Sequence, residues 1–368
     1  MKFLIFLTGV TFLFSSCLSK HKEDEKGQTI VIDEINEQKL ELPDITSQIK
    51  ILSLETEADE SIVGHIRDIC CVDDMVYILD DITQSILVFN MNTGKFIKRV
   101  HSIGQGPNEY IHPIAISSCA DNVYLLDISA NRIICYDKHL NPVRTIRLSF
   151  ASSDFIAFAD GFYLYNISSV NLKKVVHLGK NGTVANSFIS TSKNTTIDGT
   201  VDFTGNHFSI ANNGTIYFVE SLINRIFCIN NKTNVTMQEV DFGKNNIPES
   251  FDVNSIGFSD IPYAFIAEFF ALDNYNIISF LKNGKRYYSI FETSTGRQKT
   301  GIVTDHKCEI PFFPQWQLNN NILIGACYYQ DIEANFDNIK DCFITDIEED
   351  SFDDEASFLL FFNISFQK

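Results

Sequence analysis

Short apolar runs separated by turn residues follow one another along most of this chain, and one arrangement of them occurs twice in succession. The first copy contains Met75–Leu79 and Ile86–Phe89, and the second contains Val123–Leu126 and Ile133–Tyr136. The two copies align without a gap at an offset of 47 residues. Short runs rich in Val, Ile, Phe and Tyr are typical of β-strands. A fixed period of this kind predicts a repeat architecture.

Each copy has the pattern of a four-stranded antiparallel meander. In the first copy, the central pair is flanked by Ile66–Cys71 and Lys95–Val100, and Asp, Asn and Gly occupy the turns between the strands, as hairpins require. Later copies are less regular, but each keeps a recognisable second strand. The markers of that strand are Tyr77, Tyr124, Tyr163, Tyr217, Ile278 and Leu323. Six such units, with no amphipathic helix between them, predict an all-β, six-bladed β-propeller.

The two ends of the repeat region are expected to meet. In the last unit, the sequence predicts strands at Asn321–Ile324, Cys342–Ile344 and Phe358–Phe362. A lone apolar run, Ile49–Leu54, precedes the first unit and has no unit of its own. We expect this run to pair into the last blade and close the ring, because closure removes an open sheet edge.

The N-terminal residues have the pattern of a targeting segment. Lys2 precedes an apolar run, Phe3–Phe14, which is too short to span a bilayer. Small residues then lead to Cys17, as in a bacterial lipobox. The sequence predicts a signal peptide at 1–16, a lipidated Cys17 with a flexible, charged tether at 17–45, and the propeller at 46–368. The alternative is an ordinary cleavable signal with an incidental cysteine.

Charge and cysteine content narrow the classes of partner and environment. The formal net charge of −18 argues against a nucleic-acid partner and against polybasic docking to anionic lipid. Eight cysteines follow Cys17, and an even number permits disulfides in an exported protein. Most of them lie in apolar runs, which favours buried free thiols. They are Cys70, Cys71, Cys119, Cys135, Cys228, Cys308, Cys327 and Cys342.

The segment Tyr124–Ile133 reads aromatic, aliphatic, Asp, a short polar loop, and then Asn-Arg-Ile. This order resembles an NHL-type repeat. Together with Cys17, the Leu54–Thr56 segment and the Gly104–Tyr110 stretch between the first two units, it makes residues 46 to 368 resemble the six-bladed β-propeller lipoproteins of Bacteroidetes. The resemblance implies a propeller in the outer membrane, at the cell surface or on the periplasmic side, and it implies no defined reaction. The acidic run Glu23–Glu25 resembles the surface-export signal of such lipoproteins, with a plain solvated linker as the alternative.

The connections between blades, and the loops between second and third strands, share one face of a propeller at the channel mouth. Two glycines and a proline hold the stretch Gly104–Tyr110, so we expect a stiff turn that presents its acidic residue. The competing interpretation is structural, because Asp and Asn residues cap loops and aromatic residues pack between blades. The candidate ligand-binding residues are Glu109, Tyr110, His112, Asp127 and Trp316.

The sequence favours a binding protein over an enzyme. The oxygen-rich loops of this face could bind Ca²⁺, and His65, His112 and His207 near the starts of innermost strands could hold another metal. The sequence has no metal-site signature, nucleophile elbow or phosphate loop, so we predict no cofactor. We expect a monomer, attached to the membrane through Cys17, that acts as a non-catalytic binding or scaffold module for a glycan, peptide or partner protein. The alternative is a metal-dependent propeller lactonase, hydrolase or lyase with its site at the channel mouth.

Overall fold

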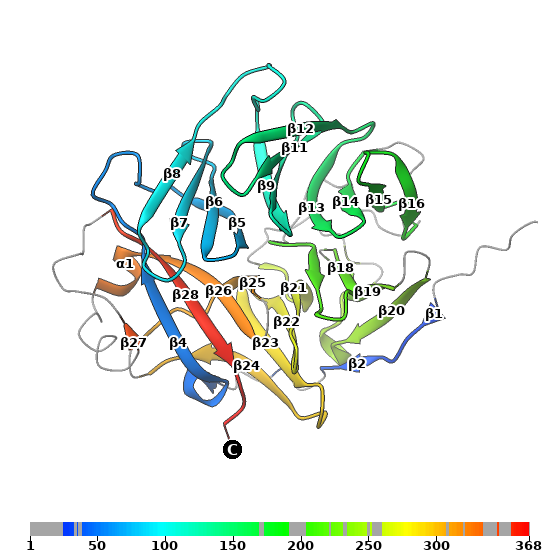
Figure 1. The fold of residues 1–368 in the computed structure, drawn as a ribbon. Coiled ribbons are helices and arrows are strands. Elements are labelled where there is room, and N and C mark those ends of the chain that lie inside the picture. The colour runs from blue at the N-terminus through cyan, green and yellow to red at the C-terminus, as the bar shows by residue number, and fades with distance from the viewer. Residues whose placement is uncertain are drawn as a thin grey trace, which may run out of the picture.

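The chain folds into six β-sheets arranged around a common centre (Figure 1). The computed structural model describes residues 25–32, 35, 39–168, 173–190, 204–220, 222–230, 234–248, 251, 260–306, 309–318, 321–333, 344–345 and 355–367. In each sheet the blade's own four strands pair antiparallel, and the first strand of the blade lies nearest the centre. This confirms the predicted all-β, six-bladed β-propeller.

Blades one to three each consist of four consecutive strands. Blade one contains β5 (Ile66–Val72), β6 (Met75–Asp80), β7 (Ser85–Asn90) and β8 (Phe96–Val100). Blade two contains β9 (Pro113–Cys119), β10 (Asn122–Asp127), β11 (Arg132–Asp137) and β12 (Pro142–Arg147). Blade three contains β13 (Ser152–Phe158), β14 (Gly161–Asn166), β15 (Val175–Gly179) and β16 (Val184–Phe188).

Blades four and five have the same four-stranded order. Blade four contains β17 (Phe208–Ile210), β18 (Ile216–Val219), β19 (Arg225–Asn230) and β20 (Asn234–Asp241), followed by the short 3₁₀ helix η2 (Gly243–Asn245). Blade five contains β21 (Phe265–Ala271), β22 (Tyr275–Lys282), β23 (Lys285–Glu292) and β24 (Gln298–Thr304).

Part of the predicted tether forms strands on the outer edges of these two blades. The strands β1 (Glu25–Lys26) and β2 (Ile30–Val31) pair parallel with β20, and β3 (Lys39–Glu41) pairs parallel with β24. The 3₁₀ helix η1 (Leu42–Asp44) then leads into the propeller. The apolar side chains of Ile32 and Leu40 are buried there. Their burial stabilises this segment against the blades, whereas its charged first residues alone would favour a solvated chain. Cys17 and the predicted signal peptide lie outside the described residues.

The sixth blade closes the ring. Its strands are β25 (Pro314–Gln317), β26 (Ile322–Tyr328), β28 (Ser357–Ile364) and the N-terminal β4 (Thr46–Ser53); helix α1 (Tyr329–Ile332) follows β26. Figure 1 shows β4 beside β28, and the two strands pair antiparallel along their whole length. The predicted closure by an N-terminal strand is therefore confirmed.

One strand assignment in the last blade is wrong. The predicted third strand at Cys342–Ile344 is instead β27 (Ile344–Thr345), which pairs parallel with β4 at the outer edge. The third strand is β28, which is hydrogen-bonded on both sides, to β26 and to β4. A strand in this position needs a continuous apolar run, and β28 supplies one, because Phe358–Phe362 is fully buried.

The cores lie between neighbouring blades. Residues of blades one and two form one buried cluster, in which Tyr77 and Val88 pack with Ile116 and Val123. The cysteines Cys70, Cys71, Cys119, Cys135, Cys228 and Cys327 are free. Four of them, Cys70, Cys135, Cys228 and Cys327, are buried, as predicted for thiols in apolar strands, whereas Cys71 and Cys119 are partly exposed. Cys308 and Cys342 lie outside the described residues.

Candidate functional site

The innermost strands of blades one, three, five and six share a β-bulge that redirects the residue after it. Register shifts occur between Ile66 and Asp68 in β5, Ser152 and Asp154 in β13, Ile266 and Glu268 in β21, and Pro314 and Trp316 in β25. A bulge re-aims a side chain and interrupts the pairing of its strand. The three acidic residues and the tryptophan therefore occupy corresponding positions in blades one, three, five and six.

A cavity of about 810 Å³ lies at the centre of the propeller, and all six innermost strands contribute to its wall. Its lining includes the turns that join first and second strands, at Asp73, Asp121 and Asn213, so the cavity opens on that face. Asp68, Asp154 and Asn206 line the cavity at the other end of the innermost strands, which we call the floor.

The floor is held together by hydrogen bonds between three blades. Asp68 in blade one accepts a hydrogen bond from the indole Nε1 of Trp316 in blade six at 2.9 Å. Its other carboxylate oxygen accepts one from the backbone N–H of Ile116 in blade two at 2.8 Å. The Asp68 side chain therefore connects the last blade, the first and the second.

The same kind of bond recurs around the ring. In each case, a side chain of one innermost strand accepts a hydrogen bond from a backbone N–H of the next blade. The pairs are Ser117 with Ala157 (3.0 Å), Asp154 with His207 (2.8 Å) and Ser209 with Ala271 (2.9 Å). Because these bonds satisfy buried backbone donors, the wall of the cavity is preorganised rather than loose.

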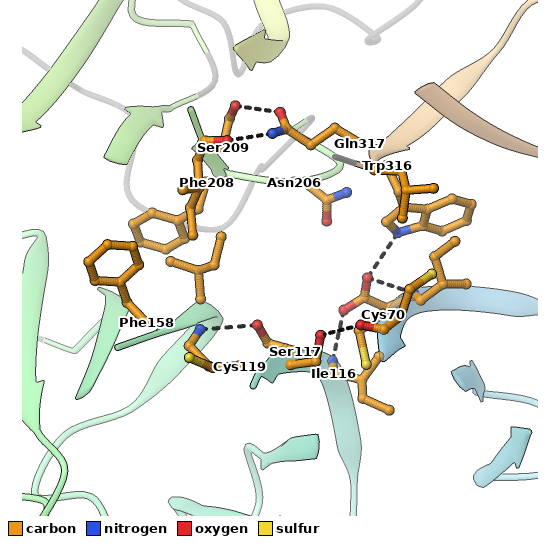
Figure 2. A pocket seen from close by; sticks show the side chains of 18 of the residues that line it. Cys70, Ile116, Ser117, Cys119, Phe158, Asn206, Phe208, Ser209, Trp316 and Gln317 are labelled. Carbon is orange, nitrogen blue, oxygen red and sulfur yellow. Dashed lines mark hydrogen bonds between the residues drawn. The ribbon is translucent and has the colours of Figure 1, made fainter. Parts of the chain in front are cut away.

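Amide and aromatic groups complete the wall. Figure 2 shows Phe158 and Phe208 on one side of the cavity, Trp316 on the other, and Asn206 between them. The side chain of Gln317 accepts a hydrogen bond from the Ser209 hydroxyl at 2.7 Å, which joins blades six and four (Figure 2). Hydroxyl, amide and carboxylate groups beside aromatic rings are what a pocket for a sugar or a peptide presents.

The charge of the lining is acidic. Asp68, Asp73, Asp121 and Asp154 line the cavity, and the described lining contains no Lys, Arg or His. Burial raises the pKa of Asp68 to about 7, and the negative charge of Asp154 adds to the rise. The hydrogen bonds from Ile116 and Trp316 oppose it, because they stabilise the carboxylate.

Of the candidate residues chosen from sequence, Trp316 lies in the cavity wall. Glu109, Tyr110 and His112 lie on the connection between blades one and two, outside the cavity lining. Tyr110 is buried, and its hydroxyl donates to the carbonyl of Val100 at 3.0 Å. The carboxylate of Glu109 accepts a hydrogen bond from the N–H of Gly106 at 2.8 Å within its own turn. His112 is exposed. A ligand-binding role for these residues stays a prediction.

Asp127 holds the connection between blades one and two through hydrogen bonds with its backbone. It is fully buried and accepts hydrogen bonds from the backbone N–H groups of Ile111 and His112 and from Nε of Arg132 at 3.1 Å. Arg132 in turn donates to the carbonyl of Gly106 at 3.1 Å. These bonds account for the Asp and Arg of the NHL-like pattern as elements that fix the turn. A ligand role for Asp127 also stays a prediction.

The three histidines considered as metal ligands have separate surroundings. Nδ1 of His65 lies 2.7 Å from Asp81, and that of His207 lies 3.1 Å from Asp154, whereas His112 is exposed on the inter-blade connection. Within the described residues, no group of three or more His, Cys, Asp or Glu side chains is placed to hold a metal ion. In the same part of the chain, no helix is long and apolar enough to cross a membrane.

Sequence reasoning missed the floor of the cavity. Asp68, Asp154 and Asn206 lie in or beside the innermost strands, where the apolar pattern directed attention to the core. A signal was present nonetheless, because Asp68 and Glu268 are carboxylates within first strands that are mostly apolar. Such residues need a polar partner or a solvated space, which a propeller channel provides.

The comparisons with known proteins place the chain in a family. The model described as "Domain of unknown function (DUF4934)" matches residues 27–351. The chain belongs to the DUF4934 family. No curated protein matches this DUF4934 sequence.

Two solved structures share the propeller of this DUF4934 protein. A putative exported protein from Bacteroides fragilis NCTC 9343 is 14% identical, with a TM-score of 0.66 over 93% of this chain and 100% of that one. A member of the DUF4221 family from Bacteroides vulgatus ATCC 8482 is 9% identical, with a TM-score of 0.52 over 87% of this chain and 97% of that one. At these identities the likeness shows the fold alone.

Proposed function

We propose that this DUF4934 protein is an exported, non-catalytic binding module whose ligand, a glycan or a peptide, occupies the central cavity. The observation that carries the proposal is the cavity itself, which all six blades line with hydrogen-bonding side chains and aromatic rings. Its volume is in the range of cavities that enclose small ligands. A rigid wall supports binding, because a preorganised site loses little conformational freedom when the ligand enters.

The aromatic ring of Phe158 allows a direct test. Phe158 is partly exposed at the cavity wall, whereas Phe313 is an exposed aromatic residue outside the lining. Wild-type protein is screened against glycan and peptide arrays, and hits are measured again with Phe158→Ala and with Phe313→Ala as the matched control. We expect Phe158→Ala to weaken binding about tenfold, as loss of one stacking ring does, and Phe313→Ala to leave it unchanged. Ligands whose affinity is unchanged by Phe158→Ala, or whose binding is lost in Phe313→Ala, would contradict the proposal.

The alternative of a metal-dependent enzyme lacks a comparable observation. A metal at the channel mouth needs several ligands brought together, and the described residues contain no such group. The cavity floor instead consists of side chains that are bonded between blades. We therefore propose binding rather than catalysis.

Export and anchoring form the second part of the proposal. The predicted signal peptide with its Cys17 supports lipid anchoring in the outer membrane, and the likeness to a putative exported protein is consistent with export. Cys17→Ser should shift the protein from the membrane fraction to the soluble fraction and abolish labelling by a palmitate analogue. Equal membrane retention of the variant would contradict the lipid anchor, and it would leave the cavity proposal untouched.

A further inference from the structure

We propose that the ligand of the central cavity carries a primary ammonium group, as a lysine side chain or a polyamine does, and that this group binds at the floor beside Asp68 and Asp154. The inference rests on the proposed function, because it requires a ligand in the cavity. It adds the chemical class of that ligand.

The charged side chains of the cavity lining favour a cationic ligand. The four charged residues of the described lining are all aspartates, two at the rim and two at the floor. At the rim, Asp73 and Asp121 are largely exposed and share Lys138, whose Nζ lies 2.8 Å and 3.7 Å from them. The rim is therefore partly neutralised. At the floor, Asp154 lies 3.1 Å from Nδ1 of His207. The side chains and backbone groups that donate hydrogen bonds to Asp68 are neutral, so its carboxylate, when ionised, has no cation beside it among the described residues.

The groups around Asp68 are neutral or negative. The neutral ones are the thiol of Cys70 on its own strand, the N–H of Ile116 on β9 and the indole of Trp316 on β25. The negative one is the carboxylate of Asp154 on β13. The neighbouring cation on its strand, Arg67, is engaged elsewhere, with the carbonyl of Ile114 at 2.7 Å and with Asp81 at 3.5 Å. Among the described groups facing Asp68, none is a fixed cation.

A cationic ligand would offset the negative charge of Asp68 and Asp154. Two carboxylates that line the same cavity oppose each other's ionisation, and a bound cation favours the ionised form of both. An ammonium group also donates three hydrogen bonds, which suits carboxylate and amide oxygens at the floor. The pKa of Asp68, raised by burial to about 7, falls when the cation binds. Binding of the cation therefore releases a proton from Asp68 near neutral pH.

The test uses three peptides of similar size in calorimetric titrations. They are N-acetyl-trilysine amide, its ε-acetylated neutral form, and N-acetyl-triglutamate amide. The lysine ammonium groups stay protonated over the pH range used, so any pH dependence belongs to the protein. We expect trilysine to bind at least tenfold more tightly than either of the others. If the bound cation lowers the pKa of Asp68 by one unit, binding is about fivefold tighter at pH 8 than at pH 6.

Variants and a proton count make the result specific. Asp68→Asn should remove the pH dependence of trilysine binding, and Asp154→Asn should weaken that binding. Asp59 is exposed and lies outside the cavity lining, so Asp59→Asn should bind trilysine as the wild type does. In wild-type protein, titrations in two buffers of different ionisation enthalpy should show proton release at pH 7 and none well above it, so the test does not depend on how the variants fold.

The outcomes separate the two proposals. Trilysine that fails to bind, or that binds no better than its acetylated form, overturns the cationic ligand. Phe158-dependent binding of a neutral glycan would then leave the proposed function standing. Loss of Phe158 dependence for every ligand in the screens overturns the proposed function itself.

Discussion

The indole of Trp316 donates a hydrogen bond of 2.9 Å to the carboxylate of Asp68, so the innermost strand of the last blade is joined to that of the first. The same two blades are also brought together at the periphery, because the N-terminal strand β4 completes blade six before the chain enters blade one. The ring is thus closed near the axis by a side-chain bond and at the rim by a backbone ladder.

Burial of Asp68 makes the stability of the propeller depend on pH. The pKa of Asp68 is raised to about 7 in the folded protein, well above its usual value near 4. Between these values the folded protein holds a proton that the unfolded chain has lost. The contribution of Asp68 to the free energy of unfolding therefore falls as pH rises from about 4 to about 7, by up to about 1.4 kcal/mol per pH unit, and is constant above.

Urea unfolding of wild type and Asp68→Asn across this range measures the effect. The difference in free energy of unfolding between the two proteins should change with that slope below pH 7 and level off above it, while the exposed Asp59→Asn should show no such slope. A difference that stays constant between pH 5 and pH 7 would show that Asp68 is ionised throughout.

Because β4 closes the ring, a single substitution in this strand should lower the free energy of unfolding substantially. Ile51 is buried in the core between blades five and six, and β4 pairs with β28. Ile51→Ala should lower the free energy of unfolding by about 2–5 kcal/mol, as truncation of a buried aliphatic side chain does. Ile97 lies on the outer strand of blade one and is half exposed, so Ile97→Ala should cost less than about 1 kcal/mol. Equal effects in thermal or urea unfolding would contradict the closure.

Much of the fold could be predicted from the sequence, because its signals are local. Turn residues and strand-length apolar runs occur within single blades, and the 47-residue offset relates two neighbouring blades. Together they predicted the architecture and the closing strand. The third strand of blade six was assigned wrongly because the local sequence pattern does not determine which strands pair in the folded sheet. Cys342–Ile344 reads as a strand by itself, but position in the sheet depends on which run can be buried on both sides, and that is Phe358–Phe362.

The candidate site was less predictable. Trp316 was found because it lies with Phe312 and Phe313 at the start of the sixth innermost strand, where aromatic residues can form a platform for a ligand. Asp68 and Asp154 were missed because their meeting depends on bulges and on blades that are far apart in sequence. Glu109 was selected because its turn is stiff, and the structure shows that the carboxylate itself helps to stiffen it by accepting the Gly106 N–H.

That bond predicts what Glu109 contributes. Glu109→Gln keeps the shape of the side chain and replaces a charge-assisted hydrogen bond by a neutral one, which should lower the free energy of unfolding by about 1 kcal/mol. Ligand binding should be unaffected, because Glu109 lies outside the cavity lining. Binding lost at unchanged melting temperature would instead place a site on the turn between blades one and two.

Burial of the cysteines predicts slow thiol chemistry in the native protein. Burial raises the pKa of Cys71 to about 12 and that of Cys228 to about 11, and it raises that of the Cys70 thiol well above its usual value. The thiolate is the reactive form, so these residues should resist iodoacetamide at pH 8 and react fully in guanidinium. Mass spectrometry of the labelled peptides gives the result for each residue. A Cys70–Cys71 disulfide, or rapid native labelling of Cys228, would contradict the buried free thiols.

A crystal structure of the protein with the tightest ligand from the binding screens would locate the binding site. We expect ligand density in the central cavity, against Phe158 and with a polar or cationic group within hydrogen-bonding distance of Asp68 or Asp154. An empty cavity, with the ligand bound at the Glu109 turn or on an outer blade edge, would contradict the proposed function.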